Sequence, residues 1–167
     1  MLISNLIIGK NGATTLEGSS YGLSFPADKE QMLKIRGIAG AILVGGATYR
    51  SEPYQSLDKP VLVSSTKATG LSNPRFGEIL NLSPLDLADY ALKRHPSPVL
   101  VEGGRDFLLP LLKARKISRM YLTVSETSGD DRFVEYSQLT SGMQLKERSK
   151  VPEGAFEVWE LSNFNFK

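Results

Sequence analysis

The sequence contains no cysteine and only one histidine, His95. The lack of cysteine excludes disulfide bonds, thiolate nucleophiles and cysteine-ligated metals. A metal site would need carboxylates and other oxygen ligands, and we expect none, because the adjacent Asp130 and Asp131 stand without further clustered acids and are typical of a solvated loop. His95 follows a predicted helix and precedes Pro96, which indicates a surface position at the helix end rather than a catalytic one.

The chain also lacks long apolar runs and a strong charge of one sign. No segment approaches the ~20 apolar residues that cross a bilayer, and the start of the sequence is strand-like rather than a leader. We therefore expect a cytoplasmic protein without membrane contact. The formal net charge is only +2 and the basic residues are scattered, which argues against nucleic acid as a partner. With 167 residues, 41% of them hydrophobic, we expect residues 1–167 to form a single domain.

Two stretches share one pattern, and the rest of the chain is organised around them. Residues 98–113 read PVLVEGGRDFLLPLLK, and residues 41–50 read AILVGGATYR. In each, an apolar strand-like run meets a Gly-Gly pair. Glycines at such turns let backbone N–H groups approach a ligand, and a helix start adds unpaired donors and partial positive charge. One pair alone would be explained by turn geometry, but two pairs predict a nucleotide site at the carboxyl ends of adjacent parallel strands.

The remaining pattern predicts an α/β fold. Strands are expected at 2–8, 41–44, 60–64, 99–101 and 117–125, and helices at 28–37 (with Asp28 as N-cap), 83–94 and 105–116. Segments 13–26 and 126–139 are expected to be loops or irregular, 48–54 a short helical or irregular piece, and 143–150 and 153–161 an antiparallel pair. This order indicates a mostly parallel central sheet with flanking helices and a C-terminal antiparallel hairpin.

Several polar residues stand out within this pattern. Asn5 lies in an otherwise apolar strand, where it needs a partner or a ligand. Ser64 and Ser65 end a strand with no acid nearby, which suits the 2′-phosphate of NADP but is also an ordinary solvated turn. Arg36, in the last turn of its helix, either stabilises the helix dipole or contacts a phosphate.

Several segments together resemble one known family. They are Asn5-x-x-x-x-x-Asn11-Gly12-Ala13, Gly18-x-Ser20-x-Gly22-Leu23, Ala27-Asp28, Leu33-x-x-Arg36, residues 41–52 and Val101-Glu102-Gly103-Gly104. In this order and spacing the chain resembles the dihydrofolate-reductase-like pyrimidine reductases, which are stand-alone relatives of the reductase half of the riboflavin-biosynthesis deaminase-reductase. The resemblance implies a dihydrofolate-reductase-like fold, a homodimer, and NADPH-dependent reduction of the ribosyl group of 5-amino-6-(5-phosphoribosylamino)uracil to the ribityl product.

The resemblance also implies roles by position. Glu102 resembles the glutamate that recognises the pyrimidine, Asn5 the polar residue that faces it, and Asn11 the catalytic residue of the first turn. The substrate's ribose and phosphate would be bound by Ser20, Ser24, Arg36 and Glu52. NADPH would be bound by Gly45, Gly46, Thr48, Ser64, Ser65, Gly103, Gly104 and Arg105.

Two other functions stay open. The same cofactor site could serve a dihydrofolate-like pterin or another pyrimidine, because a fold does not fix the substrate. The chain could also be a non-catalytic nucleotide-binding homologue. The last alternative follows from Asn11, because the family usually has aspartate there, and asparagine keeps the turn but loses the charge.

Overall fold

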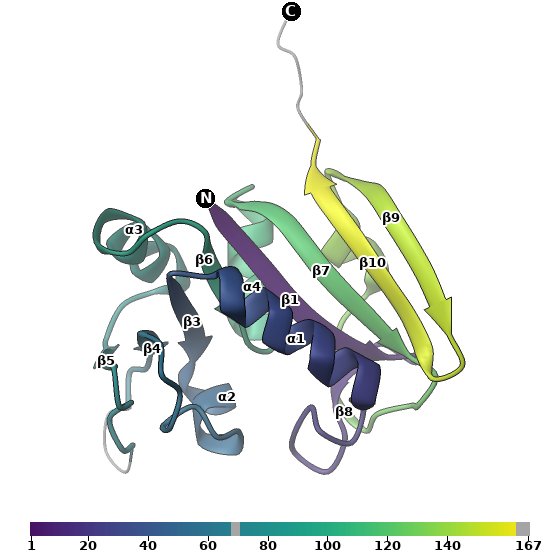
Figure 1. The fold of residues 1–167 in the computed structure, drawn as a ribbon, viewed down its shortest axis with the longest axis horizontal. Helices are drawn as coiled ribbons and strands as arrows, with labels where there is room; N and C mark the ends of the chain where they lie inside the picture. The colour runs from purple at the N-terminus through teal and green to yellow at the C-terminus, as the bar shows by residue number, and fades with distance from the viewer. Residues whose placement is uncertain (68–70, 163–167) are drawn as a thin grey trace, which may run out of the picture.

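Short apolar runs form the strands of one eight-stranded sheet (Figure 1). The computed structural model describes residues 1–67 and 71–162. Across the sheet the strands lie in the order β5-β4-β3-β6-β1-β7-β10-β9. Their bounds are β1 Leu2–Gly9, β3 Ala41–Gly45, β4 Val61–Ser64, β5 Gly77–Leu80, β6 Val99–Glu102, β7 Ile117–Ser125, β9 Met143–Val151 and β10 Gly154–Leu161.

The directions of the strands match the sequence prediction. Every neighbouring pair from β5 to β7 is parallel, whereas β10 is antiparallel to both β7 and β9. The mostly parallel sheet with a C-terminal antiparallel hairpin is therefore confirmed. Because β3 and β6 are parallel neighbours, with Ile42 opposite Leu100, their carboxyl ends lie side by side.

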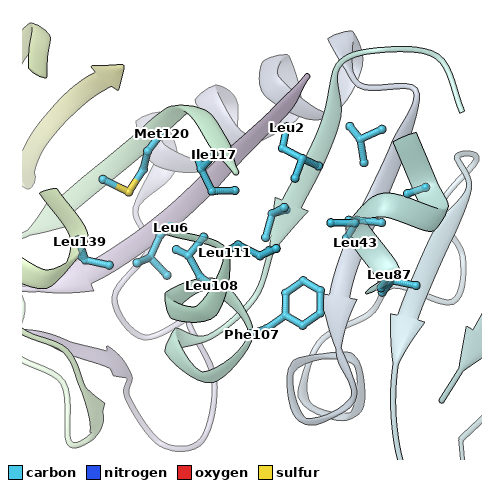
Figure 2. Packing of buried hydrophobic residues seen from close by; sticks show 14 of the residues in the cluster. Leu2, Leu6, Leu43, Leu87, Phe107, Leu108, Leu111, Ile117, Met120 and Leu139 are labelled. Carbon is cyan, nitrogen blue, oxygen red and sulfur yellow. The ribbon is translucent and has the colours of Figure 1, made fainter. Parts of the chain in front are cut away.

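Alternation along the strands divides the core between the two faces of the sheet. Leu6 of β1 belongs to a buried cluster with Leu108 and Leu111, which Figure 2 shows together. Ile3 of the same strand belongs to a second cluster with Ile35, on the opposite face. The helices on the first face are α3 (Pro84–Arg94), α4 (Arg105–Lys113) and α5 (Tyr136–Thr140). The second cluster includes Ile35 of α1 (Pro26–Ile38) and Tyr49 of α2 (Gly46–Ser51).

The start of α1 differs from the prediction. The helix begins at Pro26 rather than after Asp28, and its N-cap, Phe25, makes no side-chain capping bond. Proline suits the first helical position because its φ is already helical and its missing N–H would have no acceptor there. Asp28 therefore lies inside the first turn, where it is buried.

Short elements occupy two segments that the sequence pattern predicts as irregular and one that it predicts as helical or irregular. Helix α2 (Gly46–Ser51) follows β3, and β2 (Ala13–Thr15) pairs with β8 (Asp131–Phe133) as a separate two-stranded sheet. These elements have three to six residues, too few to show periodicity, and β2 and β8 depend on pairing between distant segments. The loop after β2 is fixed in the same way, since Glu17 N donates to Asp130 Oδ2 at 3.0 Å.

Within the two described ranges, the helices are all too short or too polar to cross a membrane.

Candidate active site

Two clefts lie at the carboxyl ends of the central strands. The first cleft is lined by side chains from β1, the loop after β2, α1, the segment after α2 and the end of β6, among them Asn5, Ser20, Ser24, Asp28, Arg36, Glu52, Tyr54, Glu102 and Gly103. The second cleft is lined by residues that include Gly45, Gly46, Ser64, Asp106 and Phe107. Both clefts are lined by Ala47, Thr48, Gly104 and Arg132, so they meet at these four residues.

Glu102 at the end of β6 is the centre of a buried charge cluster. Arg36 of α1 donates from Nε to Glu102 Oε1 at 2.8 Å and from Nη2 to Oε2 at 2.6 Å. Only 5% of the Glu102 side chain and 17% of the Arg36 side chain are exposed. Burial lowers the pKa of Arg36, but the hydrogen bonds and the charge of Glu102 outweigh it and raise that pKa above its ordinary value. Arg36 is therefore paired with Glu102, whereas the resemblance implies that it binds the phosphate of the substrate.

Tyr54 completes this cluster. Its hydroxyl donates to Glu102 Oε2 at 2.9 Å, and its ring stacks on Tyr49 and lies beneath the guanidinium of Arg36. Burial, followed by the charges of Glu102 and Glu52, raises the pKa of Tyr54 well above its ordinary value. Tyr54 therefore stays protonated and acts as a hydrogen-bond donor to Glu102.

The two serines of the first cleft also bind carboxylates. Ser20 donates from its backbone N and from Oγ to Glu52 Oε1, at 3.2 and 2.5 Å. Ser24 Oγ donates to Asp28 Oδ2 at 2.5 Å, and Asp28 is only 6% exposed. The resemblance implied that Ser20, Ser24 and Arg36 form a phosphate cluster, but all three donate to acids. A phosphate placed at either serine would meet a carboxylate, which is unfavourable.

Asn5 lines the first cleft directly beside Glu102. The two residues are paired in the register of β1 and β6. The side-chain amide of Asn5 forms no hydrogen bond with residues 1–67 or 71–162, and Asn5 is only partly buried. Its donor and acceptor are thus available to a ligand.

The two glycine turns are needed for different reasons. Gly103 has φ +145°, a backbone conformation that residues with a Cβ rarely adopt. Gly46 packs so closely that an added Cβ would lie 2.9 Å from Ser65 Oγ. Gly104 N donates to Thr48 Oγ1 at 3.1 Å, which ties the turns together and occupies that N–H. The N–H groups of Arg105 and Asp106, in the first turn of α4, have no acceptor within the helix.

The serines at the end of β4 donate to the backbone. Ser64 Oγ donates to Leu82 O at 2.7 Å, and Ser65 Oγ donates to Lys67 O at 3.0 Å. Ser64 lines the second cleft. Arg50 of α2 donates to Lys67 O at 2.9 Å and reaches Ser65 Oγ at 3.5 Å, so a guanidinium lies beside these serines.

Besides Ser65, two predicted site residues lie outside the lining of both clefts in the described chain. Asn11 uses its amide to hold the β1–β2 turn: Oδ1 accepts from Gly129 N at 3.0 Å and from Ala13 N at 3.3 Å, and Nδ2 donates to Gly129 O. Arg105 binds Phe133 O at 2.7 Å and Asp106 at 3.1 Å. Both side chains connect the clefts' supporting segments rather than facing a ligand.

Several lining residues are not identified as functional by the sequence pattern, among them Asp28, Lys29, Tyr54 and Arg132. Asp28 was interpreted as a helix cap, although Pro26 before it already indicated the helix start. Tyr54 and Arg132 lie in segments without periodicity, so only the tertiary structure brings them to the clefts. Over the described ranges, there is no group of three or more histidine, cysteine, aspartate or glutamate residues that could hold a metal ion.

Comparisons with known proteins bear on the fold. No protein-family model matches the sequence, and no curated protein matches it. Among solved structures, the deaminase/5-amino-6-(5-phosphoribosylamino)uracil reductase of Thermotoga maritima is similar with a TM-score of 0.77 at 13% identity; the alignment covers 97% of this chain and 56% of that one. The chain therefore spans little more than half of that protein.

Two single-domain structures align over almost their whole length. Enterococcus faecalis dihydrofolate reductase, solved in complex with NADP(H), has a TM-score of 0.70 at 16% identity, with 96% of this chain and 95% of that one covered. A pyrimidine reductase-like protein of Corynebacterium diphtheriae has a TM-score of 0.68 at 17% identity, with 97% and 92% covered. The chain thus has the fold shared by dihydrofolate reductase and the reductases of riboflavin biosynthesis, as the sequence resemblance implied.

Proposed function

We propose that this chain is an NADPH-dependent reductase of a pyrimidine-containing heterocycle. The observation that carries the proposal is the junction of the two clefts: a cleft around the buried carboxylate Glu102 meets, at Thr48 and Gly104, a cleft built on two glycine turns. A dinucleotide bound along the second cleft would bring its reactive end to this junction. The fold shared with known reductases supports the same function.

The residues of the second cleft fit a dinucleotide. Gly45 and Gly46 have no side chains to obstruct it, and the first turn of α4 offers unpaired N–H groups to a phosphate. Arg50 and Lys67 beside Ser65 suit the extra phosphate that distinguishes NADPH from NADH. When bound, the reduced nicotinamide supplies the hydride, and the chain's own groups orient the substrate and exclude water.

The specific substrate that we propose is 5-amino-6-(5-phosphoribosylamino)uracil. Glu102 would accept an N–H of the pyrimidine, Asn5 would bond a neighbouring ring atom, and Glu52 would contact the ribose chain. Because Arg36 is held by Glu102, the phosphate of this substrate would be met by another cation of the first cleft, such as Lys29 of α1. Asn11 would have a supporting role in the turn rather than a catalytic one.

A second candidate is favoured by the carboxylates of the first cleft. Ser20 and Ser24 donate to Glu52 and Asp28, so this part of the cleft presents acids instead of phosphate-binding groups. Acids suit the amino and ring N–H groups of a pterin. A dihydrofolate-like substrate without a phosphate is therefore the alternative, and the non-catalytic nucleotide-binding homologue is the third possibility to test.

One set of measurements separates these functions. NADPH and NADH binding are measured by calorimetry, and oxidation of NADPH is then followed spectroscopically with the phosphoribosylaminouracil and, separately, with dihydrofolate. Turnover with the aminouracil supports the first proposal, and turnover only with dihydrofolate supports the second. Binding without turnover identifies a non-catalytic homologue, and no binding of either dinucleotide rejects all three.

The homodimer implied by the resemblance is also a proposal. The edge strand β9 offers a free backbone edge, but its exposed residues include Lys146, Glu147, Arg148 and Lys150, and charged edges resist pairing with another strand. A dimer would therefore have to match these charges across the interface. Light scattering at two salt concentrations tests it: a dimer mass supports the proposal, and a monomer mass at both concentrations rejects it.

A further inference from the structure

Arg132 of β8 lines both clefts and is one of the four residues at their junction. In the described part of the chain its guanidinium makes no hydrogen bond, and its nearest acid is Asp106, with Nη1 and Oδ2 4.0 Å apart. Arg36 and Arg105 differ from it, because their guanidinium groups donate to Glu102 and to Phe133 O. Arg132 is therefore a cation at the junction with most of its donors unused.

The backbone of Arg132 is in an unfavourable conformation. Its φ is +54°, in the left-handed region, where a residue with a Cβ loses roughly 1–2 kcal/mol. The conformation is held on both sides, because Thr14 Oγ1 donates to Arg132 O at 2.9 Å and Arg132 N donates to Asp131 Oδ1 at 2.7 Å. Glycine or asparagine would adopt this backbone more easily, so what arginine adds at this position is its side chain.

The groups around Arg132 suit an anion at the junction of the two clefts. Thr48 and Gly104 lie at the same junction, and the first turn of α4, whose Asp106 lines the second cleft, has N–H groups without an acceptor in the helix. The acid that pairs with the Arg132 guanidinium, Asp106, has a side chain that is 72% exposed and is also paired with Arg105 at 3.1 Å, so its charge is largely compensated. The acids of the first cleft that belong to the substrate region, Asp28 and Glu52, are bonded to serines.

We propose that Arg132 binds the diphosphate of the dinucleotide where it passes from the second cleft into the first. This inference rests on the proposed function, because it assumes that a nicotinamide dinucleotide occupies the second cleft. A guanidinium binds two phosphate oxygens at once, with five donors in a planar arrangement. Arg132 is then a binding residue that fixes the position of the nicotinamide relative to Glu102, and the backbone strain is retained for that contact.

Calorimetry with four variants and two ligands tests this assignment. Arg132→Gln removes the charge, Arg132→Lys keeps it without the planar donors, and Arg132→Gly removes it while relaxing the backbone. The control is Arg115→Gly, because Arg115 has nearly the same φ, +55°, and does not line either cleft of the described chain. The ligands are NADPH and adenosine 2′-monophosphate, which lacks the diphosphate.

The expected result is selective for the diphosphate. Arg132→Gln and Arg132→Gly weaken NADPH binding about tenfold or more, Arg132→Lys weakens it less, and all three leave the affinity for adenosine 2′-monophosphate unchanged. Arg132→Gly should weaken NADPH binding without lowering the melting temperature of the protein. Arg115→Gly should leave the affinities for both ligands unchanged.

Three outcomes contradict the expectation in different ways. If the wild-type protein binds NADPH and the Arg132 variants bind it equally well, the role of Arg132 is rejected and the proposed function stands. If the Arg132 variants lose affinity for both ligands alike, Arg132 acts on the fold or the adenosine end, and the diphosphate contact is rejected. If the wild-type protein does not bind NADPH, the proposed function fails and this inference fails with it.

Discussion

Three hydrogen bonds already reach the carboxylate of Glu102, two from Arg36 and one from Tyr54. A carboxylate offers about four lone-pair sites, so about one remains for a ligand. That single acceptor suits one N–H of a flat heterocycle, with Asn5 beside it to bond the next ring atom. At the scale of single residues, the cleft thus fixes the position of the Glu102 side chain and leaves one acceptor site of its carboxylate open.

Replacing Glu102 tests this arrangement. Glu102→Gln leaves the buried Arg36 without its partner charge, so we expect the free energy of unfolding to fall by about 3 kcal/mol. Substrate turnover should fall much more than NADPH affinity, since Glu102 lines the first cleft and not the second. Urea unfolding and calorimetry measure both effects.

Glu160→Gln is the matched control. Glu160 pairs with Arg119 through side chains that are 34% and 43% exposed, so its loss should cost less than about 1 kcal/mol and leave turnover unchanged. Equal effects of Glu102→Gln on turnover and on NADPH binding would reject the substrate-binding role of Glu102.

Asp28 separates the two substrate classes. The Asp28 carboxylate is buried at the first cleft and accepts from Ser24, which leaves its other oxygen available to a donor. If a pterin-like substrate donates to it, Asp28→Asn should reduce turnover about a hundredfold while NADPH affinity stays constant. Steady-state kinetics with dihydrofolate measure this, and undiminished turnover would exclude Asp28 from substrate binding.

At the scale of elements, the turn between β6 and α4 couples the two clefts. Gly103 takes a φ of +145° there, and Gly104 N bonds to Thr48 Oγ1 of α2. The turn thereby fixes the start of α4 against the start of α2, although the two helices follow different strands. The same turn also sets the position of Glu102, the residue before it.

A side chain at Gly103 should disturb this coupling. In Gly103→Ala we expect a loss of about 1–3 kcal/mol in the free energy of unfolding, because the left-handed φ is strained for alanine. An added Cβ would meet its nearest neighbours, Gly45 N and Thr48 Oγ1, at 3.6 and 3.7 Å, so steric overlap is not the cause. Gly37→Ala is the control, because an added Cβ there has no neighbour within 4 Å; equal stabilities of the two variants would contradict the prediction.

The C-terminal hairpin is joined to α5 by a further buried acid. Glu157 of β10 is 1% exposed and accepts hydrogen bonds from Tyr136 of α5, Arg148 of β9 and Trp159. Burial, the hydrogen bond to Glu157 and the charge of that carboxylate raise the pKa of Tyr136 to about 12. This network connects three elements that lie away from both clefts.

The Tyr136 shift predicts how stability depends on pH. An unfolded tyrosine ionises near pH 10, whereas folded Tyr136 keeps its proton to about pH 12. The folded state therefore binds more protons between these values, and its stability falls as the pH rises from about 10 to 12. Tyr136→Phe should reduce that fall, as measured by urea unfolding at pH 9 and at pH 11. An identical fall in both proteins would exclude Tyr136 as its source.

At the scale of the whole molecule, the clefts are assembled from segments far apart in the sequence. Ligand binding should therefore stabilise the whole described fold rather than one element. At an NADPH concentration of a hundred times its dissociation constant, we expect a gain of about 2.7 kcal/mol and a rise in melting temperature of roughly 5–10 °C. Differential scanning calorimetry checks this, and a rise with NADPH that is matched by NADH would remove the role given to Arg50 and Lys67.

The sequence predicted the sheet and its directions well, because buried strands such as Val99–Glu102 are continuous apolar runs between clear turn signals. It also brought Asn5, Glu102 and the glycine turns to one end of the sheet. It could not reveal that Arg36 and the two serines bind acids, because those partners lie 66, 32 and 4 residues away and the choice between an acid and a ligand depends on rotamers. Arg132 was missed for a related reason, since its position depends on β8 pairing with β2.

The pairing of β2 with β8 also determines when the first cleft can be completed during synthesis of the chain. The segment around β2 contributes Thr14, Thr15 and Gly18 to the lining of the first cleft. Its residues Asn11, Thr14 and Glu17 form hydrogen bonds to residues 113 to 118 positions further on. On the ribosome, β2 has no partner strand until the chain has been made beyond Phe133. A nascent chain that stops earlier would contain β1, β3 and β6 but lack the β2–β8 pair beside the first cleft, so this site is completed late in translation.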